Sequence, residues 1–154
     1  MNDIFSLIMV SKQKNELENI LEINQYTCNF GLSLNEQEVM RLLRHRVSCL
    51  KEQKRVEFEG GILELLIKEF CNSAYIYQDN YVQTLEALQE IFYICKNESL
   101  DELSDDAILQ FMRKRFEGKC QGDLDYLEQI CLEDLCRPVR FAESELLGGV
   151  EDEE

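Results

Sequence analysis

The residues whose type and spacing most suggest chemistry are the positive side chains of one predicted helix. Ser33 and Glu36 form an S-x-x-E capping box, which predicts a helix running to about Lys54. Its basic side chains fall within an arc of roughly 120° at helical pitch. They are Arg41, Arg44, His45, Lys51 and Arg55. Such a face either pairs with acidic side chains nearby or docks an acidic partner or a phosphate-bearing ligand.

The opposite side of this helix is apolar and is expected to face the core. Its members are Val39, Leu42, Leu43, Val47 and Leu50. Arg46 lies among these residues in helical angle, between Leu42 and Leu50. We expect its stem to run over the edge of the core and its guanidinium to reach solvent. If Arg46 is buried instead, it needs a carboxylate or a ligand as partner.

Two tyrosines suggest a possible small-molecule pocket. Tyr75 and Tyr77 fall in a predicted loop, Asn72 to Gln78, between two apolar helices. Tyrosines in such a loop usually pack over the helix ends with their hydroxyls in solvent. In the alternative interpretation, they line a pocket together with Arg46 and the glycine turn Gly60-Gly61.

The cysteines offer a third kind of chemistry. The chain has seven of them, an odd number, and no pair has the CxxC spacing of a zinc or redox motif. We expect most to be small buried hydrophobic residues in a reducing compartment. An alternative is a metal or thiol sensor that uses Cys120, Cys131 and Cys136. No metal site and no cofactor is predicted.

Catalytic constellations are not found in the sequence. His45 is the single histidine, which rules out a site built from several histidines and leaves a nucleophile–histidine pair dependent on one residue of the basic face. No P-loop, dinucleotide fingerprint or HExxH motif is present. With 31 carboxylates, pairs at helical spacing arise by chance. We therefore predict no catalytic residues, and the sequence leans against an enzyme without excluding one.

Charge and hydropathy restrict the partners. The formal net charge of −15 argues against binding nucleic acid or an anionic membrane, since both are themselves anionic. No apolar run reaches eighteen residues, and the N-terminus lacks the features of a signal peptide. We expect a cytoplasmic protein with a protein partner, without contact to nucleic acid or membrane.

Two stretches have the apolar content of central helices. Residues 62–71 are apolar around well over half of the helix circumference, and the Gly60-Gly61 turn precedes them. In the stretch 81–95, apolar residues follow one another at intervals of four, three, four and three, which is helical periodicity. They are Tyr81, Leu85, Leu88, Phe92 and Cys95.

The remaining segments complete an all-α prediction. Ser11 is expected to cap a helix reaching about Cys28, after a segment 1–10 that is either a short helix or extended. Ser104 is expected to cap residues 105–117, and Asp123 to begin a last helix that Pro138 stops. The prediction is a compact bundle of about five to seven helices around two central apolar helices. It forms one domain, residues 1–141 with a core of about 28–137, followed by a disordered acidic tail, residues 142–154.

Several stretches resemble an uncharacterised family of short, acidic helical bacterial proteins, mainly from Firmicutes. The resemblance is carried by EFEGGILELLIKEFCNSAYI, DNYVQTLEALQEIFYICKNESLDELSDD and GKCQGDLDYL, and extends from about Cys28 to Cys136. It implies a bacterial, cytoplasmic protein. It implies no activity, cofactor or catalytic residue, because the family is a domain of unknown function.

The sequence favours a protein–protein interaction or accessory module. The two-faced charged helix, the acidic tail and the lack of catalytic constellations support this interpretation. A small-molecule-binding protein or enzyme with a pocket near Arg46, Tyr75 and Tyr77 is the first alternative. The cysteine-based metal or thiol sensor is the second.

Overall fold

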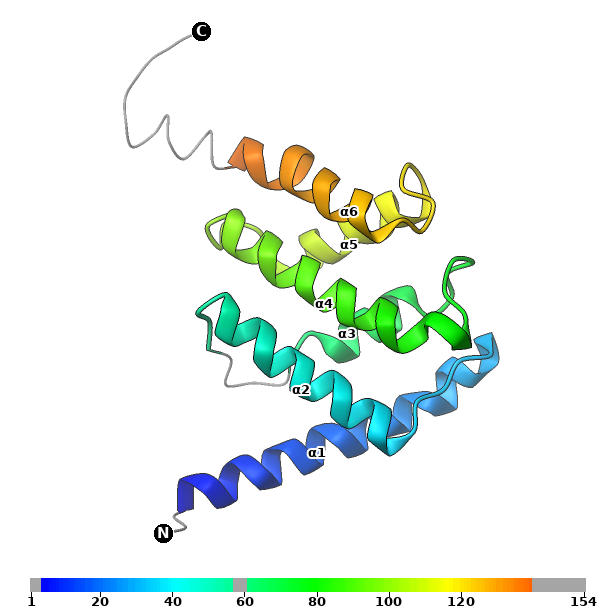
Figure 1. Cartoon of the computed structure of the whole chain (residues 1–154), viewed down its shortest axis with the longest axis vertical. Coiled ribbons are helices and arrows are strands. Elements are labelled where there is room, and N and C mark those ends of the chain that lie inside the picture. The colour runs from blue at the N-terminus through cyan, green and yellow to red at the C-terminus, as the bar shows by residue number, and fades with distance from the viewer. Residues whose placement is uncertain (1–3, 57–60, 140–154) are drawn as a thin grey trace, which may run out of the picture. The chain divides into compact units, whose positions relative to one another are not determined.

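The chain folds into helices joined by short connections (Figure 1). A computed structural model describes residues 4–56 and 61–139, with side chains from Lys14 onward. These residues form six α-helices and no strand. The helices are α1 (Ile4–Thr27), α2 (Glu36–Glu52), α3 (Leu63–Phe70), α4 (Tyr81–Glu98), α5 (Asp105–Glu117) and α6 (Leu124–Ile130). The prediction of an all-α fold with five to seven helices is confirmed.

The chain divides into two compact units, Met1–Glu86 and Ala87–Glu154, whose boundary falls inside α4. The single domain 1–141 stays a prediction. The acidic tail, residues 142–154, lies outside the described residues. In the described ranges, no helix combines the length and the apolar character that a membrane span requires.

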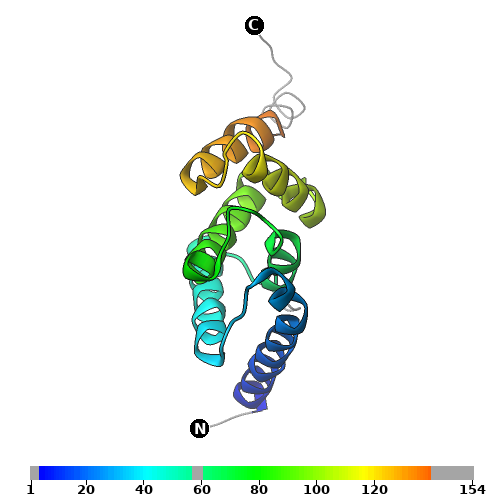
Figure 2. The same ribbon diagram turned by 90° about the vertical axis from the view of Figure 1, so that its right-hand side faces the viewer.

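In the first unit, α1 packs against both α2 and α3, and α2 packs against α3 (Figures 1 and 2). Burial of the apolar sides of these helices supplies the driving force for folding, at about 25 cal/mol for each Å² removed from water. The fully or almost fully buried side chains include Ile20, Val39, Leu42, Leu63, Leu66, Ile67, Phe70 and Leu85.

In the second unit, α5 packs against α6, and α6 continues into a π-helical turn, Cys131–Cys136. Phe92 and Tyr93 in the second half of α4 are buried and meet edge to face, with ring centroids 5.3 Å apart. Buried side chains from the other helices include Ile108, Leu109, Met112, Phe116, Leu127 and Ile130. The residues spaced by four, three, four and three along α4 are all buried, as their periodicity predicts.

The first helix is longer than the sequence suggests. The backbone is helical without interruption from Ile4 to Thr27. The prediction that Ser11 caps a helix is therefore wrong, because residues 4–10 contain no glycine or proline and the helix propagates through them. Residues 1–3 lie outside the described part of the chain.

The start of α2 also differs from the prediction. Asn35 is the N-cap, and it forms a reciprocal capping box with Glu38 through bonds of 2.8 and 2.9 Å. Ser33 is not the cap, because Gln78 holds its backbone. The Gln78 side chain accepts from the Ser33 N–H at 2.8 Å and donates to its carbonyl at 3.0 Å.

Two helices end in a left-handed residue that is not glycine. After α2, Lys54 has φ 56°, and the Arg55 N–H donates to the Leu50 carbonyl at 2.8 Å. After α4, Leu100 has φ 57°, and the Asp101 N–H donates to the Lys96 carbonyl at 3.1 Å. Both are Schellman motifs in which a side chain occupies the position that glycine prefers.

Candidate functional site

One face of α2 points into solvent and carries positive charge. Arg44, Val47, Ser48 and Lys51 are all exposed and follow the helical spacing of three, four and seven residues. We call these four residues the α2 outer face. The opposite side buries Val39, Leu42, Leu43, Arg46 and Cys49. The capping box at Asn35 and the Schellman motif at Lys54 define the two ends of the helix that presents this face.

Arg41, one of the predicted basic residues, is held by a carboxylate. Its Nε donates to Glu86 Oε2 at 2.8 Å and its Nη2 to Oε1 at 2.9 Å, a two-pronged pair. The hydrogen bond and the charge of Glu86 raise the pKa of Arg41. At this position the basic face pairs with an acidic side chain of its own chain.

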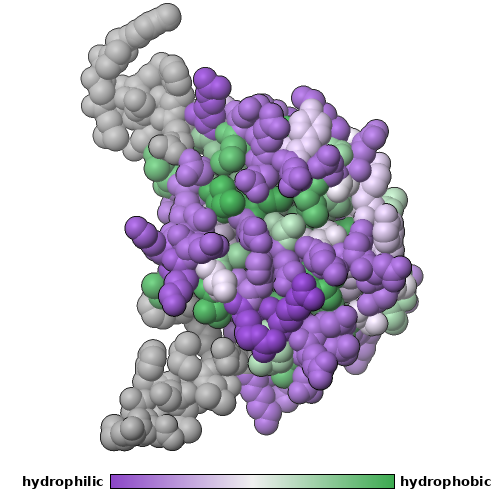
Figure 3. All heavy atoms as spheres, viewed as in Figure 1, coloured by the Kyte–Doolittle hydropathy of each residue, from purple (hydrophilic) through white to green (hydrophobic). Residues whose placement is uncertain are grey.

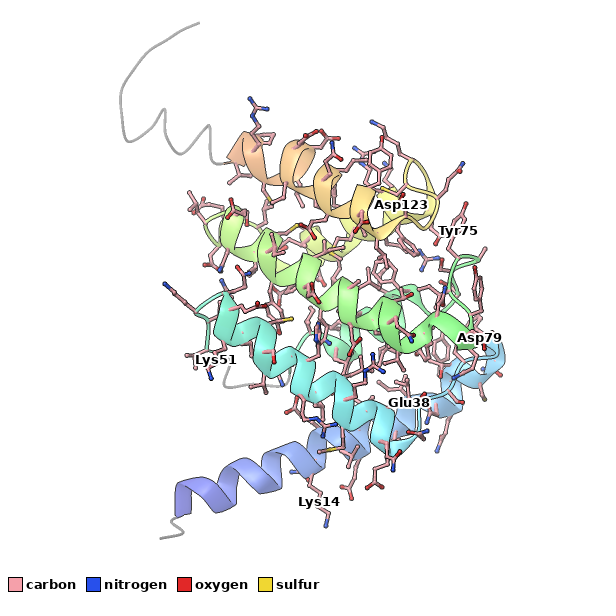
Figure 4. All side chains as sticks on the ribbon, in the orientation of Figure 1. Lys14, Glu38, Lys51, Tyr75, Asp79 and Asp123 are labelled. Carbon is pink, nitrogen blue, oxygen red and sulfur yellow. The ribbon has the colours of Figure 1, made fainter. Side chains whose placement is uncertain are left out.

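The other four predicted basic residues differ in exposure. His45 and Arg55 are half-buried and make contacts within the protein. Arg44 and Lys51 are exposed, and neither forms an ion pair with any side chain that the structure describes. Figure 4 shows Lys51 near the C-terminal end of α2. Arg44 and Lys51 are therefore the cations on α2 that remain available to a partner.

Val47 lies between these two cations and is 52% exposed. The prediction that it faces the core is wrong. Arg46 occupies the buried side of α2 instead. Val47, the next residue, is rotated from Arg46 by about 100° around the helix axis and therefore lies at the edge of the buried side. On the side of the molecule drawn in Figure 3, hydrophobic residues are scattered among more numerous hydrophilic ones.

Arg46 is buried, with only 6% of its surface exposed. Its Nη1 donates to Glu16 Oε2 of α1 at 2.9 Å, and the two side chains are 8% and 14% exposed. The expectation that its guanidinium reaches solvent is wrong, whereas the expectation that a buried Arg46 needs a carboxylate is confirmed. The sequence did contain a signal for this partner. Glu16 lies four residues before the buried Ile20, and so on the side of α1 that faces the core.

Gly61 accommodates the same arginine. A Cβ at this position would overlap the guanidinium of Arg46, so a side chain here would displace it. The backbone approaches a side chain closely at this point, which only glycine permits. Gly60, the other residue of the predicted turn, lies outside the described residues.

Tyr75 and Tyr77 follow the other end of α3. Tyr75 is half-buried in the loop labelled in Figure 4, and its N–H donates to Ser73 Oγ at 3.1 Å. Tyr77 is 60% exposed. Arg46 lies beside Gly61, before α3 begins, and the eight residues of α3 span about 12 Å. A pocket shared by Arg46, Tyr75 and Tyr77 stays a prediction.

Six of the seven cysteines are buried, as predicted, and Cys28 is exposed. Cys95, Cys131 and Cys136 meet in the second unit, where the Cys136 thiol donates to the Cys95 carbonyl at 3.5 Å. Hydrogen bonds with Cys131 and Cys136, together with burial, raise the pKa of Cys95. Burial also raises the pKa of Cys120. The sequence grouped Cys120 with Cys131 and Cys136 and missed Cys95, which its place in the apolar periodicity of α4 could have indicated.

The raised pKa of Cys95 and of Cys120 makes these two thiols poor metal ligands and nucleophiles, because both roles need the thiolate. Within the described ranges, no group of three or more histidine, cysteine, aspartate or glutamate side chains is arranged to hold a metal ion. The structure thus places Cys95, Cys120, Cys131 and Cys136 as buried, packed side chains of the second unit.

Comparison with known proteins gives a family and no function. No curated protein and no solved structure matches the chain. The sequence model of a family of unknown function, DUF6323, matches residues 19–145, a longer stretch than the resemblance between Cys28 and Cys136 indicated. The chain belongs to this family of unknown function.

Proposed function

We propose that the protein is a protein–protein interaction module and that the α2 outer face binds an acidic polypeptide segment. One observation carries the proposal. Arg44 and Lys51 are exposed on one side of a well-defined helix and form no ion pair with a described side chain, although the chain has a net charge of −15.

The spacing of the cations on this face supports an acidic partner. Arg44 and Lys51 are seven residues apart, which separates them by about 10 Å along the helix axis. An acidic helix matches this spacing with carboxylates seven residues apart. Val47 lies between the cations and supplies an exposed apolar contact. An apolar centre flanked by charged groups is the usual arrangement of a small protein interface.

The strength of the charge contribution is modest. An exposed ion pair contributes about 0.2–1 kcal/mol, so two such pairs change the affinity by up to about 30-fold. They also accelerate association at low ionic strength and steer the partner to this face. The partner is a polypeptide and neither nucleic acid nor an anionic membrane. Nucleic acid and anionic membranes are negative throughout and are repelled by the net charge of −15, whereas a polypeptide confines its carboxylates to the short segment that meets Arg44 and Lys51.

The setting that we propose is the bacterial cytoplasm. The resemblance to short bacterial proteins, mainly from Firmicutes, and the cysteines kept as free thiols support it. The proposed interaction requires no cofactor and no catalytic residue of this chain.

Co-purification from the native cell with charge-reversed variants tests the proposal. The test variant is Arg44→Glu with Lys51→Glu. The matched control is Arg137→Glu with Lys119→Glu, which reverses one exposed arginine and one exposed lysine in the second unit. We expect the control to retain an acidic polypeptide that the test variant loses, with equal melting temperatures. The proposal is wrong if both variants retain the same polypeptides in the same amounts.

A further inference from the structure

The first unit has an open pocket that the proposed interaction does not use. It has a volume of about 350 Å³ and is lined by Ile23 and Tyr26 of α1 and by Lys68 of α3. Small-molecule sites usually have volumes of about 300–1,000 Å³, so this pocket suits a ligand at the small end of that range. The helices that form it, α1 and α3, pack against each other.

The α1 side of the pocket is apolar and aromatic. Ile23 and Tyr26 are three residues apart and therefore lie on the same side of α1. Tyr26 is 51% exposed, and its ring meets that of Phe30 edge to face, with centroids 5.5 Å apart and planes at 74°. This contact restricts the Tyr26 ring, which gives a ligand a preformed aromatic surface to pack on.

The α3 side of the pocket supplies a cation. Lys68 is exposed and forms no ion pair with any side chain in the described ranges. A lysine stem packs on apolar surface while its ammonium group stays at the rim, in water. The pocket therefore combines one positive group with apolar walls. Leu65, one turn earlier on α3, adds a further exposed apolar side chain at 43% exposure.

We propose that this pocket binds a small carboxylate with an aromatic body. The aromatic ring packs between Ile23 and Tyr26, where an edge-to-face or offset contact with the tyrosine is available. The carboxylate pairs with the ammonium group of Lys68. A neutral apolar ligand would leave this cation unused, and a multiply charged anion would meet only one cation among the lining residues Ile23, Tyr26 and Lys68.

The openness of the pocket sets the expected affinity. A ligand of about ten heavy atoms with part of its surface still in water binds weakly, with a dissociation constant on the order of 1 mM. The contribution of Lys68 is that of an exposed ion pair, which corresponds to about threefold in affinity.

Two probes with the same aromatic body, one with a carboxylate and one with an uncharged hydroxyl, separate the apolar contact from the ionic one. The full chain is titrated at low salt with 3-phenylpropionate and with uncharged 3-phenylpropanol, and backbone amide shifts are followed by NMR. We expect saturable shifts around Ile23, Tyr26 and Lys68 with both probes. We expect Lys68→Gln to reduce the affinity for the carboxylate about threefold and to leave the affinity for the alcohol unchanged. We expect Tyr26→Ala to reduce the affinity for both probes.

Lys119→Gln is the matched control, because it makes the same substitution at an exposed lysine of the second unit that neither proposal uses. It leaves the affinity for both probes unchanged, and melting curves confirm that every variant is folded. The proposal fails if the carboxylate gives no saturable shifts, or if the shifts lie away from α1 and α3. It also fails if Lys68→Gln affects carboxylate binding no more than Lys119→Gln does.

Discussion

Removing the carboxylate that pairs with Arg46 is expected to destabilise the first unit strongly. In Glu16→Gln the side chain keeps its size and loses its charge, while Arg46 stays 6% exposed among apolar residues. Removing one partner of a buried ion pair lowers the free energy of unfolding by about 3–5 kcal/mol. Arg46 has further contacts and Glu16 is 14% exposed at its side chain, so we expect about 2–4 kcal/mol.

Urea denaturation followed by circular dichroism measures this loss, with Glu18→Gln as the matched control. Glu18 is exposed on the same helix, two residues away. We expect Glu18→Gln to change the free energy of unfolding by less than about 0.5 kcal/mol. The double variant Glu16→Gln with Arg46→Met removes both charges and recovers part of the loss. The reasoning is refuted if Glu16→Gln costs no more than Glu18→Gln.

Four further predictions concern Gly61, Leu100 and the cysteines. Gly61→Ala costs about 1–3 kcal/mol in urea denaturation, because its Cβ displaces the Arg46 guanidinium, and an unchanged midpoint would contradict the close approach. Leu100→Gly raises the free energy of unfolding by about 0.5–1 kcal/mol, since glycine removes the left-handed strain and the leucine is 45% exposed; a loss would refute this. A thiol reagent modifies Cys28 in the native protein and the six buried cysteines only on unfolding, which mass spectrometry resolves. Because the pKa of Cys95 is raised in the folded state, the unfolded thiol ionises first, and stability falls as the pH rises above about 9.

Helical periodicity carries most of the information about this fold. The apolar spacing between Tyr81 and Cys95 predicted a buried helix, and these side chains are buried in α4. The N-caps Ser104 and Asp123 were also predicted correctly, because each side chain bonds to its own helix. Ser104 accepts from the Ala107 N–H, and Asp123 accepts from the Tyr126 N–H. Helical periodicity and N-caps each depend on residues that are close in sequence, so the sequence alone was enough to predict them.

Tertiary contacts explain why the predictions for the start of α2 and for Arg46 were wrong. The sequence predicted Ser33 as the N-cap of α2, but the side chain of Gln78, 45 residues away, binds the Ser33 backbone, and Asn35 is the N-cap instead. Arg46 likewise depends on Glu16, which lies on another helix 30 residues earlier. A sequence pattern shows which side of a helix a residue occupies, but it does not show which residue of another segment contacts it on that side.

The candidate site was predicted in part for the same reason. Helical angle grouped the basic residues of α2, but it did not distinguish Arg41, which pairs with Glu86, from Arg44 and Lys51, which are exposed without an ion pair to a described side chain. The exposure of Val47 also required the structure, because it depends on how the neighbouring helices cover α2. Charge patterning thus identified the helix, and packing identified which of its residues face solvent.

The most direct test of the proposed interaction is the affinity for the acidic polypeptide retained in co-purification, measured by isothermal titration calorimetry at low and high salt. We predict that reversing Arg44 and Lys51 weakens binding by at least about tenfold at low salt, and that high salt reduces the difference. Reversing Arg137 and Lys119 leaves the affinity near that of the unaltered protein. Equal affinities for the two double variants, or a difference that salt does not reduce, would contradict the assignment of the α2 outer face as the binding surface.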